Sequence, residues 1–227
     1  MDCEHSFYIA NKKIAVYPSV EPDSPIVYLN TFGREGEKVL QALRKMNCPA
    51  FTLVTISGLT WDCDMAPWDI PPISKNDTPC AGGADEYLRL LTEEIIPKTE
   101  RLLAGGISWR GIAGYSLAGL FALYSVYQTD LFSRVACMSA SFWFPDFKEY
   151  ILSHTMEGGT SHFYFSLGDK ESHTKNPYLK SVQKNTEALA SFYKQNGFDT
   201  VFMLNPGNHY QNAALRTAAG ILWILSR

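Results

Sequence analysis

The sequence predicts an α/β protein with a mostly parallel central sheet and helices on both faces. Short runs rich in β-branched and aromatic residues alternate along the chain with segments of helical period, which is typical of parallel strands joined by helices. No internal repeat, charge block or low-complexity linker interrupts this alternation. With 227 residues and a hydrophobic content of 46%, the chain is expected to form a single domain over residues 1–227.

The first half of the chain opens with a predicted antiparallel hairpin at a sheet edge. Two short strand-like runs flank the polar pair Asn11 and Lys12, which we interpret as the turn. The elements expected in this half are strands at 7–10, 13–17, 26–29 and 51–57, a helix containing Val39, Leu40 and Leu43, and a helix with Tyr87, Leu91 and Ile95 on one face.

The second half continues the same alternation. The expected elements are a strand at 111–113 followed by a helix at 117–128, strands at 134–140, 162–168 and 200–205, a helix at 177–195 and a last helix near the end of the chain. Residues 111–129 contain no charged side chain and are about as long as a membrane span. Their glycine and serine content favours a buried strand followed by a buried helix, and we expect no membrane association.

Residues 58–82 form a connection too long to be a plain loop. We interpret this segment as a wall or lid over a site. Ligands of parallel sheets bind beyond the carboxyl ends of the strands, so the residues that follow each strand are the candidates for chemistry.

Ser116 is the candidate nucleophile. It lies in Gly114-Tyr115-Ser116-Leu117-Ala118-Gly119, between a predicted strand and a predicted helix, which is the pattern of a nucleophile elbow. Small residues are needed two positions away because the turn is tight, and Ala118 stands where glycine is commoner. The helix that follows would favour developing negative charge at its N-terminus.

A serine hydroxyl needs a base that accepts its proton. His209 is the best placed of the five histidines, because it lies in a turn-rich loop between the last predicted strand and the last helix. The acid that orients the imidazole should precede it in the chain. Glu171 and Asp169 both follow the strand at 162–168. We favour Glu171 and keep Asp169 as the alternative, since Asp169 can instead close the turn through its own backbone.

Acyl transfer also requires N–H donors for the tetrahedral oxyanion. The elbow supplies the N–H of Leu117, and the loop after the strand at 26–29 should supply a second one, from Thr31 or Phe32. Aromatic residues are expected to form the substrate pocket; they are Trp61, Trp68, Tyr115, Phe142, Trp143 and Phe144.

Composition excludes several other classes of protein. With 20 basic and 23 acidic residues, nothing indicates a nucleic-acid partner. The histidines and the five cysteines, Cys3 among them, lack the spacing of a metal site, and no phosphate loop is present, so we expect neither metal nor cofactor. The acidic start without an apolar stretch and the odd number of cysteines favour a cytoplasmic protein with reduced thiols. A homodimer is compatible with the sequence.

With these residues in place, the sequence resembles the α/β-hydrolase superfamily, and within it the esterase family that includes esterase D and the enterochelin esterases. The resemblance covers residues 24–227 and rests on GYSLAG, WDCDMAPW (61–68), AGGADEYLRLLTEEIIP (81–97), SASFWFPDF (139–147), FSLGDKE (165–171) and NPGNH (205–209). It implies an α/β-hydrolase fold and a Ser-acid-His mechanism, with Ser116 as nucleophile and His209 as proton carrier.

The function expected from the sequence is therefore a serine carboxylic-ester hydrolase that acts on a small or medium ester through an acyl-enzyme. A siderophore lactone esterase and an acyltransferase on the same triad are alternatives. A catalytically silent binding protein of this fold is a third class, which an unreactive Ser116 would favour.

Overall fold

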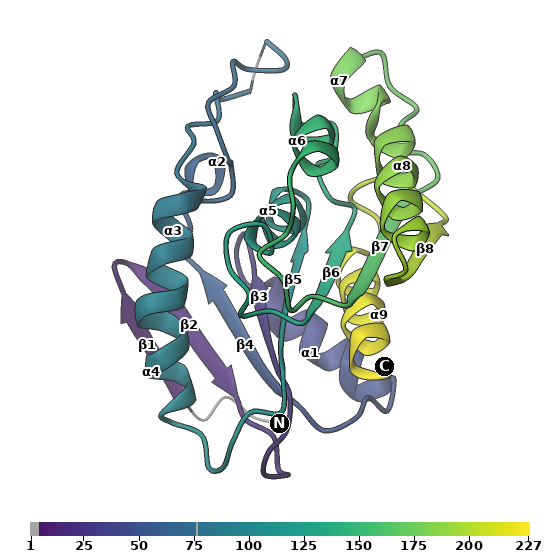
Figure 1. The fold of residues 1–227 in the computed structure, drawn as a ribbon. Helices are drawn as coiled ribbons and strands as arrows, with labels where there is room; N and C mark the ends of the chain where they lie inside the picture. The colour runs from purple at the N-terminus through teal and green to yellow at the C-terminus, as the bar shows by residue number, and fades with distance from the viewer. Residues whose placement is uncertain (1–4, 76) are drawn as a thin grey trace.

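An eight-stranded sheet forms the centre of the computed structural model, which describes residues 5–75 and 77–227 (Figure 1). The strands are β1 (His5–Ile9), β2 (Lys12–Tyr17), β3 (Ile26–Asn30), β4 (Thr52–Ser57), β5 (Arg110–Tyr115), β6 (Arg134–Met138), β7 (His162–Gly168) and β8 (Asp199–Asn205). Their order is β1-β2-β4-β3-β5-β6-β7-β8. Within this order, every neighbouring pair from β4 through β3 to β8 is parallel. At the edge, β2 pairs antiparallel with both β1 and β4. The predicted fold class is thus confirmed. Cys3 lies outside the described residues.

The edge hairpin turns one residue earlier than the sequence suggested. Ala10 and Asn11 have positive φ angles of 43° and 64°, as both central residues of a two-residue hairpin turn require when its twist matches that of the strands. Lys12 is therefore the first residue of β2 and pairs with Ile9. Its partly apolar side chain lies in the interior, only 8% exposed.

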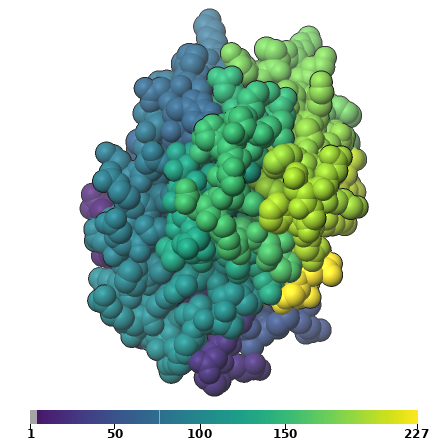
Figure 2. All heavy atoms as spheres, in the orientation of Figure 1, coloured from purple at the N-terminus to yellow at the C-terminus, as the bar shows by residue number. Residues whose placement is uncertain are grey.

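Helices cover both faces of the sheet (Figure 1). On one face lie α1 (Glu35–Lys45) and α9 (Ala213–Leu225), and on the other lie α3 (Ala84–Leu90), α4 (Ile96–Glu100), α5 (Leu117–Ser125), α6 (Phe147–Ser153) and α8 (Val182–Gln195). The short helices α2 (Trp61–Asp64) and α7 (Pro177–Lys180) belong to connecting segments. Two separate clusters of buried apolar side chains result, one on each face. The space-filling view shows that side chains cover the sheet on the face that carries α3, α4, α5, α6 and α8 (Figure 2).

The helix predicted around Tyr87 is divided by a π-helical segment, η1 (Leu91–Ile95), which joins α3 to α4. In an ideal α-helix, two side chains four residues apart point in directions that differ by about 40° around the axis. The π turn contains more residues than an α turn, so it removes part of this difference. Tyr87, Leu91, Ile95 and Thr99 are accordingly all buried. The helix is anchored at both ends, by the hydrogen bond from Tyr87 to Asn30 and by the Glu100 carboxylate, which accepts two bonds of 2.7 Å from the guanidinium of Arg110.

The uncharged stretch 111–129 consists mainly of β5 and α5, both in the protein interior. Among the described helices, none combines the length and apolar character needed to cross a bilayer.

Candidate active site

Ser116 occupies a strained turn between β5 and α5. Its φ and ψ angles are 60° and −127°, a conformation that costs a non-glycine residue free energy and is typical of functional positions. Its N–H donates to the carbonyl of Met138 at 3.1 Å, and its carbonyl accepts from Gly119 at 3.0 Å. Space is limited, because a Cβ at Gly114 would lie 2.1 Å from the carbonyl oxygen of Ala118. Alanine at position 118 itself fits and is fully buried.

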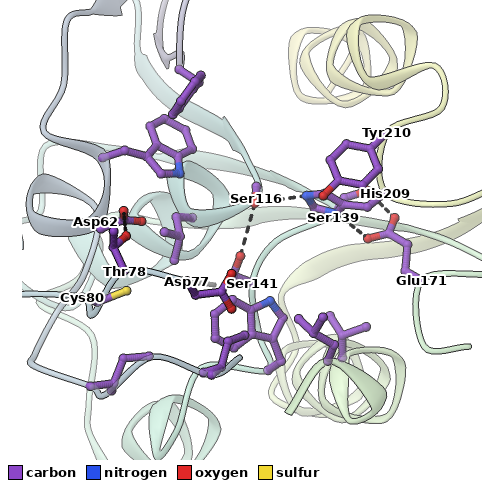
Figure 3. Close-up of a pocket in the computed structure, with 18 of the residues that line it drawn as sticks. Asp62, Asp77, Thr78, Cys80, Ser116, Ser139, Ser141, Glu171, His209 and Tyr210 are labelled. Carbon is purple, nitrogen blue, oxygen red and sulfur yellow. Dashed lines mark hydrogen bonds and ion pairs between the residues drawn. The ribbon is translucent and has the colours of Figure 1, made fainter. Parts of the chain in front are cut away.

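His209 brings its imidazole to this serine from the loop after β8. The Nε2 atom lies 3.1 Å from Ser116 Oγ (Figure 3), within reach for proton transfer. Tyr115, the residue before the serine, donates its hydroxyl hydrogen to the His209 carbonyl at 2.6 Å. The backbone of the histidine is therefore held by the last residue of β5, directly before Ser116. The side chain of His209 is 31% exposed, so solvent reaches the ring.

Glu171 faces the other nitrogen of the ring. Its Oε2 atom is 2.7 Å from His209 Nδ1, and its Oε1 atom accepts from Ser139 Oγ at 2.7 Å and from the Gly168 N–H at 2.6 Å. Burial alone raises the pKa of Glu171, but the hydrogen bonds from His209 and Ser139 outweigh this effect and hold the pKa below its ordinary value. The carboxylate is therefore charged at neutral pH and can fix the tautomer of the imidazole.

Asp169, the alternative acid, has a different set of contacts. Its Oδ1 atom accepts from the Gly207 N–H at 2.8 Å, and its own N–H donates to the Asn205 carbonyl at 2.8 Å. These two bonds join the loop after β7 to the loop that carries His209. No hydrogen bond described in the structure connects Asp169 with the imidazole itself.

Arg216, which the sequence analysis did not single out, lies behind Glu171. Its side chain is 3% exposed, and its Nη1 atom is 3.0 Å from Glu171 Oε1. The same nitrogen donates to Ser139 Oγ at 3.2 Å, while Nη2 donates to the Pro206 carbonyl at 3.0 Å. The one signal for it in the sequence is that Arg216 is the sole charged residue of α9, which is mostly apolar.

Two backbone N–H groups border the serine. The N–H of Leu117 lies at the start of α5, and no described residue accepts from it. Thr31 is not suited to be the second donor, because its N–H already donates to the Ile56 carbonyl at 2.8 Å. The expectation for Thr31 is therefore wrong. Phe32 remains, since its N–H has no acceptor among the described residues and its side chain lines the cavity around Ser116.

A cavity of about 800 Å³ opens next to Ser116 and His209. Trp143 lines it, and so do several residues of the 58–82 segment, Trp61 among them. Tyr115 lines a second, smaller cavity that also reaches Ser116. The expectation for Trp68, Phe142 and Phe144 is wrong, because none of them is among the described residues that form these walls. Trp68 packs on Phe144 and donates its indole N–H to the Pro145 carbonyl, and Phe142 is fully buried.

The described residues bring together no group of three or more side chains that could hold a metal ion. Two serines at the end of a predicted strand, Ser139 and Ser141, to which the sequence assigns no specific role, lie on the cavity wall. Ser139 binds Glu171, and Ser141 Oγ is 3.4 Å from Ser116 Oγ. Both follow β6, at the carboxyl edge of the sheet where ligands are expected.

Comparisons with known proteins identify the family of the chain. The family model described as "Putative esterase" matches residues 14–213. A relative from Bacillus subtilis (strain 168), the uncharacterized protein YbbA, is 25% identical over 206 residues, which are 83% of this chain and 80% of the relative.

Two solved structures show the same fold. The siderophore hydrolase EstA from Aspergillus nidulans has a TM-score of 0.72 at 18% identity, over 95% of this chain and 90% of that chain. An IroE-like serine hydrolase from Shewanella oneidensis also has a TM-score of 0.72, at 16% identity over 95% and 76% of the two chains.

The chain therefore has an α/β-hydrolase fold and is an enzyme that hydrolyses ester bonds. It belongs to the esterase family whose model covers residues 14–213, and the resemblance noted in the sequence is confirmed.

Proposed function

We propose that the chain is a serine carboxylic-ester hydrolase that works through an acyl-enzyme on Ser116, with His209 as proton carrier and Glu171 as the acid. The observation that carries this proposal is the pair of hydrogen bonds made by one imidazole, 3.1 Å to Ser116 Oγ and 2.7 Å to Glu171 Oε2. A serine, a base and an oriented acid in a cavity are the elements of nucleophilic acyl transfer.

Acylation begins when Ser116 Oγ attacks the ester carbonyl carbon and its proton passes to His209 Nε2. The carbonyl oxygen becomes an oxyanion, which the free N–H groups of Leu117 and Phe32 can stabilise. The charged Glu171 stabilises the imidazolium. When the tetrahedral intermediate collapses, the carbon–oxygen bond to the alcohol breaks and His209 gives its proton to the leaving oxygen.

Deacylation repeats these steps with water. His209 accepts a proton from the water whose oxygen attacks the acyl carbon, and the bond from that carbon to Ser116 Oγ then breaks. The proton returns from Nε2 to Ser116. One ester and one water thus give one acid and one alcohol, and no cofactor is consumed.

Fluorophosphonate labelling followed by intact mass and peptide mapping tests the nucleophile without knowledge of the substrate. We expect one adduct on Ser116, which is lost in Ser116→Ala and His209→Ala and retained in Ser191→Ala. Ser191 is a suitable control because it is an exposed serine on α8. A folded protein that gives no adduct, or an adduct on another serine, would overturn the proposal.

Two alternatives on the same residues are kept apart by assays of products. A siderophore lactone esterase is suggested by the names of the solved structures with this fold, and it would linearise a cyclic ester. An acyltransferase would form more ester product as an acceptor alcohol is added, at an unchanged rate of acylation.

We also propose that the protein works in the cytoplasm. The described cysteines Cys48, Cys63, Cys80 and Cys137 are free thiols, which supports a reducing compartment.

A further inference from the structure

Two cavities of different chemistry meet at the reactive serine. The larger has a volume of about 800 Å³ and the smaller about 360 Å³. Ser116, His209, Phe32, Trp61 and Tyr210 line both of them. An ester has a group on either side of its reacting carbonyl, so a substrate bound at Ser116 places one group in each cavity.

The smaller cavity has a predominantly apolar wall. Leu29, Val39 and Ala213 contribute to it, and its one charged wall residue among those described is Glu35, which is exposed. The Glu35 carboxylate accepts a hydrogen bond of 2.6 Å from the Gly33 N–H. This side of the site suits a hydrocarbon group.

The larger cavity is acidic. Its charged wall residues among those described are Asp62, Asp77 and Glu171 against Lys170. Glu171 is compensated by its ion pair with Arg216. Asp62 and Asp77 accept hydrogen bonds of 2.6 Å from neutral hydroxyl groups, and neither forms an ion pair within the described part of the chain. Their charges are therefore free to act on a ligand.

The pKa of the Cys80 thiol reflects the negative charge at this wall of the larger cavity. Cys80 lines the larger cavity, and Figure 3 shows it beside Asp62 and Thr78, across the cavity from His209 and Glu171. Burial first, and then the negative charges of Asp62 and Asp77, raise the pKa of this thiol to about 11. An anionic group bound here would meet the same unfavourable field as the thiolate.

We infer that the enzyme selects esters whose group in the larger cavity is cationic or uncharged, with a hydrocarbon group on the other side of the carbonyl, and that it discriminates against anionic esters. This inference rests on the proposed function of Ser116. It places an iron-loaded tris-catecholate lactone, which is a trianion, among the poor substrates.

The test uses thioesters as ester substrates, and the members of each series differ in the charge of one end group. In one series, butyryl thioesters carry a choline-like trimethylammonium group, its uncharged tert-butyl isostere or a carboxylate on the thiol. In a second series, the same three groups end the acyl chain. Each kcat/KM is divided by the rate of hydroxide hydrolysis, which removes differences in intrinsic reactivity.

In the series whose charged end lies in the larger cavity, we expect the cation to exceed the anion by about tenfold or more at low salt, with the preference shrinking as salt screens it. In the other series, both charged substrates should be poorer than the neutral one, since the smaller cavity is apolar.

Variants assign the preference to residues. Asp62→Asn and Asp77→Asn keep the hydrogen-bond acceptor and remove the charge, so each should reduce the cation-to-anion ratio by about threefold. Glu157→Gln, which removes an exposed carboxylate outside both cavities, should leave the ratio unchanged.

The outcomes separate this inference from the proposed function. If every ester, charged or neutral, is inert and Ser116 gives no fluorophosphonate adduct, the proposed function has failed. If neutral esters are hydrolysed but the cation-to-anion ratio is near one in both series, or is unaffected by both aspartate variants, the charge selection is refuted while the esterase stands.

Discussion

Replacing Glu171 by glutamine is expected to lower turnover strongly by reversing the imidazole tautomer. Oε1 of Glu171 accepts from three donors, Ser139, Gly168 and Arg216, whereas Oε2 faces only His209 Nδ1. The amide oxygen of the glutamine will therefore take the Oε1 position, and its NH₂ group will face Nδ1. Because NH₂ can only donate, Nδ1 must accept and the ring hydrogen moves to Nε2.

A hydrogen on Nε2 blocks the proton transfer from Ser116, whose Oγ is 3.1 Å away. In other serine triads, the amide variant of the acid lowers kcat by about 10⁴-fold through the same change of tautomer. We expect a loss of about 10³- to 10⁴-fold here, which corresponds to about 4 to 5.5 kcal/mol of transition-state stabilisation.

The assay is steady-state hydrolysis of an activated ester, with Asp169→Asn as the matched control. Asp169 accepts a single bond, from Gly207, which the asparagine oxygen preserves, so its variant should remain within about threefold of the natural enzyme. A loss below tenfold in Glu171→Gln, or a larger loss in Asp169→Asn, would refute the assignment of the acid.

Loss of folding must be distinguished from loss of chemistry, since Glu171→Gln also removes the partner of the buried Arg216. An unpaired buried charge costs about 3 to 5 kcal/mol of stability. The double variant Glu171→Gln with Arg216→Met removes that charge and should regain stability in urea unfolding, while activity stays lost. Recovery of activity in the double variant would show that the first loss was one of folding.

Three further changes have expected outcomes. Gly114→Ala should lower the free energy of unfolding by about 3 kcal/mol in urea unfolding and lower turnover, because its Cβ would meet the Ala118 carbonyl oxygen at 2.1 Å; unchanged turnover would contradict the tight elbow. Lys12→Met removes the partner of the buried Asp64 and should lower the free energy of unfolding by about 3 kcal/mol, whereas an equally stable variant would mean that the pair is solvated. Since the pKa of Glu171 is lowered in the fold, its charged form stabilises the protein above the unfolded pKa of about 4.5, and this contribution is lost as pH falls through the folded value. The difference in unfolding free energy between the natural protein and Glu171→Gln should therefore narrow below pH ~4.5, and a constant difference would argue against the lowered pKa.

The order of strands and helices could be predicted from local signals. Runs such as 51–57 and 162–168 show β character without reference to the rest of the chain, and parallel connectivity follows from their alternation with helices. The positions of Ser116 and His209 could be predicted for a related reason. Both lie in turns directly after a strand, and the carboxyl ends of parallel strands meet at one edge of the sheet.

The details that escaped prediction depend on contacts between distant segments. Arg216 stands out in the sequence as a single charge in an apolar helix, but nothing there indicates its partner until the fold places Glu171, 45 residues earlier, against it. Thr31 is equivalent to Phe32 as a donor in the sequence, and only its bond to Ile56 distinguishes them. The sequence also predicts Trp68 in the pocket, because aromatic content alone does not distinguish a cavity wall from packing beneath a loop.

The π segment η1 sets the rotational phase of the long helix against the sheet. Because a π turn holds about one residue more than an α turn, removing one residue from Leu91–Ile95 would allow ordinary helical hydrogen bonding and leave the phase of α4 against α3 nearly unchanged. Removing one residue from a regular turn of α3 or α4 would instead rotate Glu100 by about 100° relative to Tyr87, so that Tyr87 could keep its bond to Asn30 only if Glu100 left Arg110. The two anchors thus constrain the length of this helix, and the π segment is the place where one residue can be removed while both anchors stay in reach.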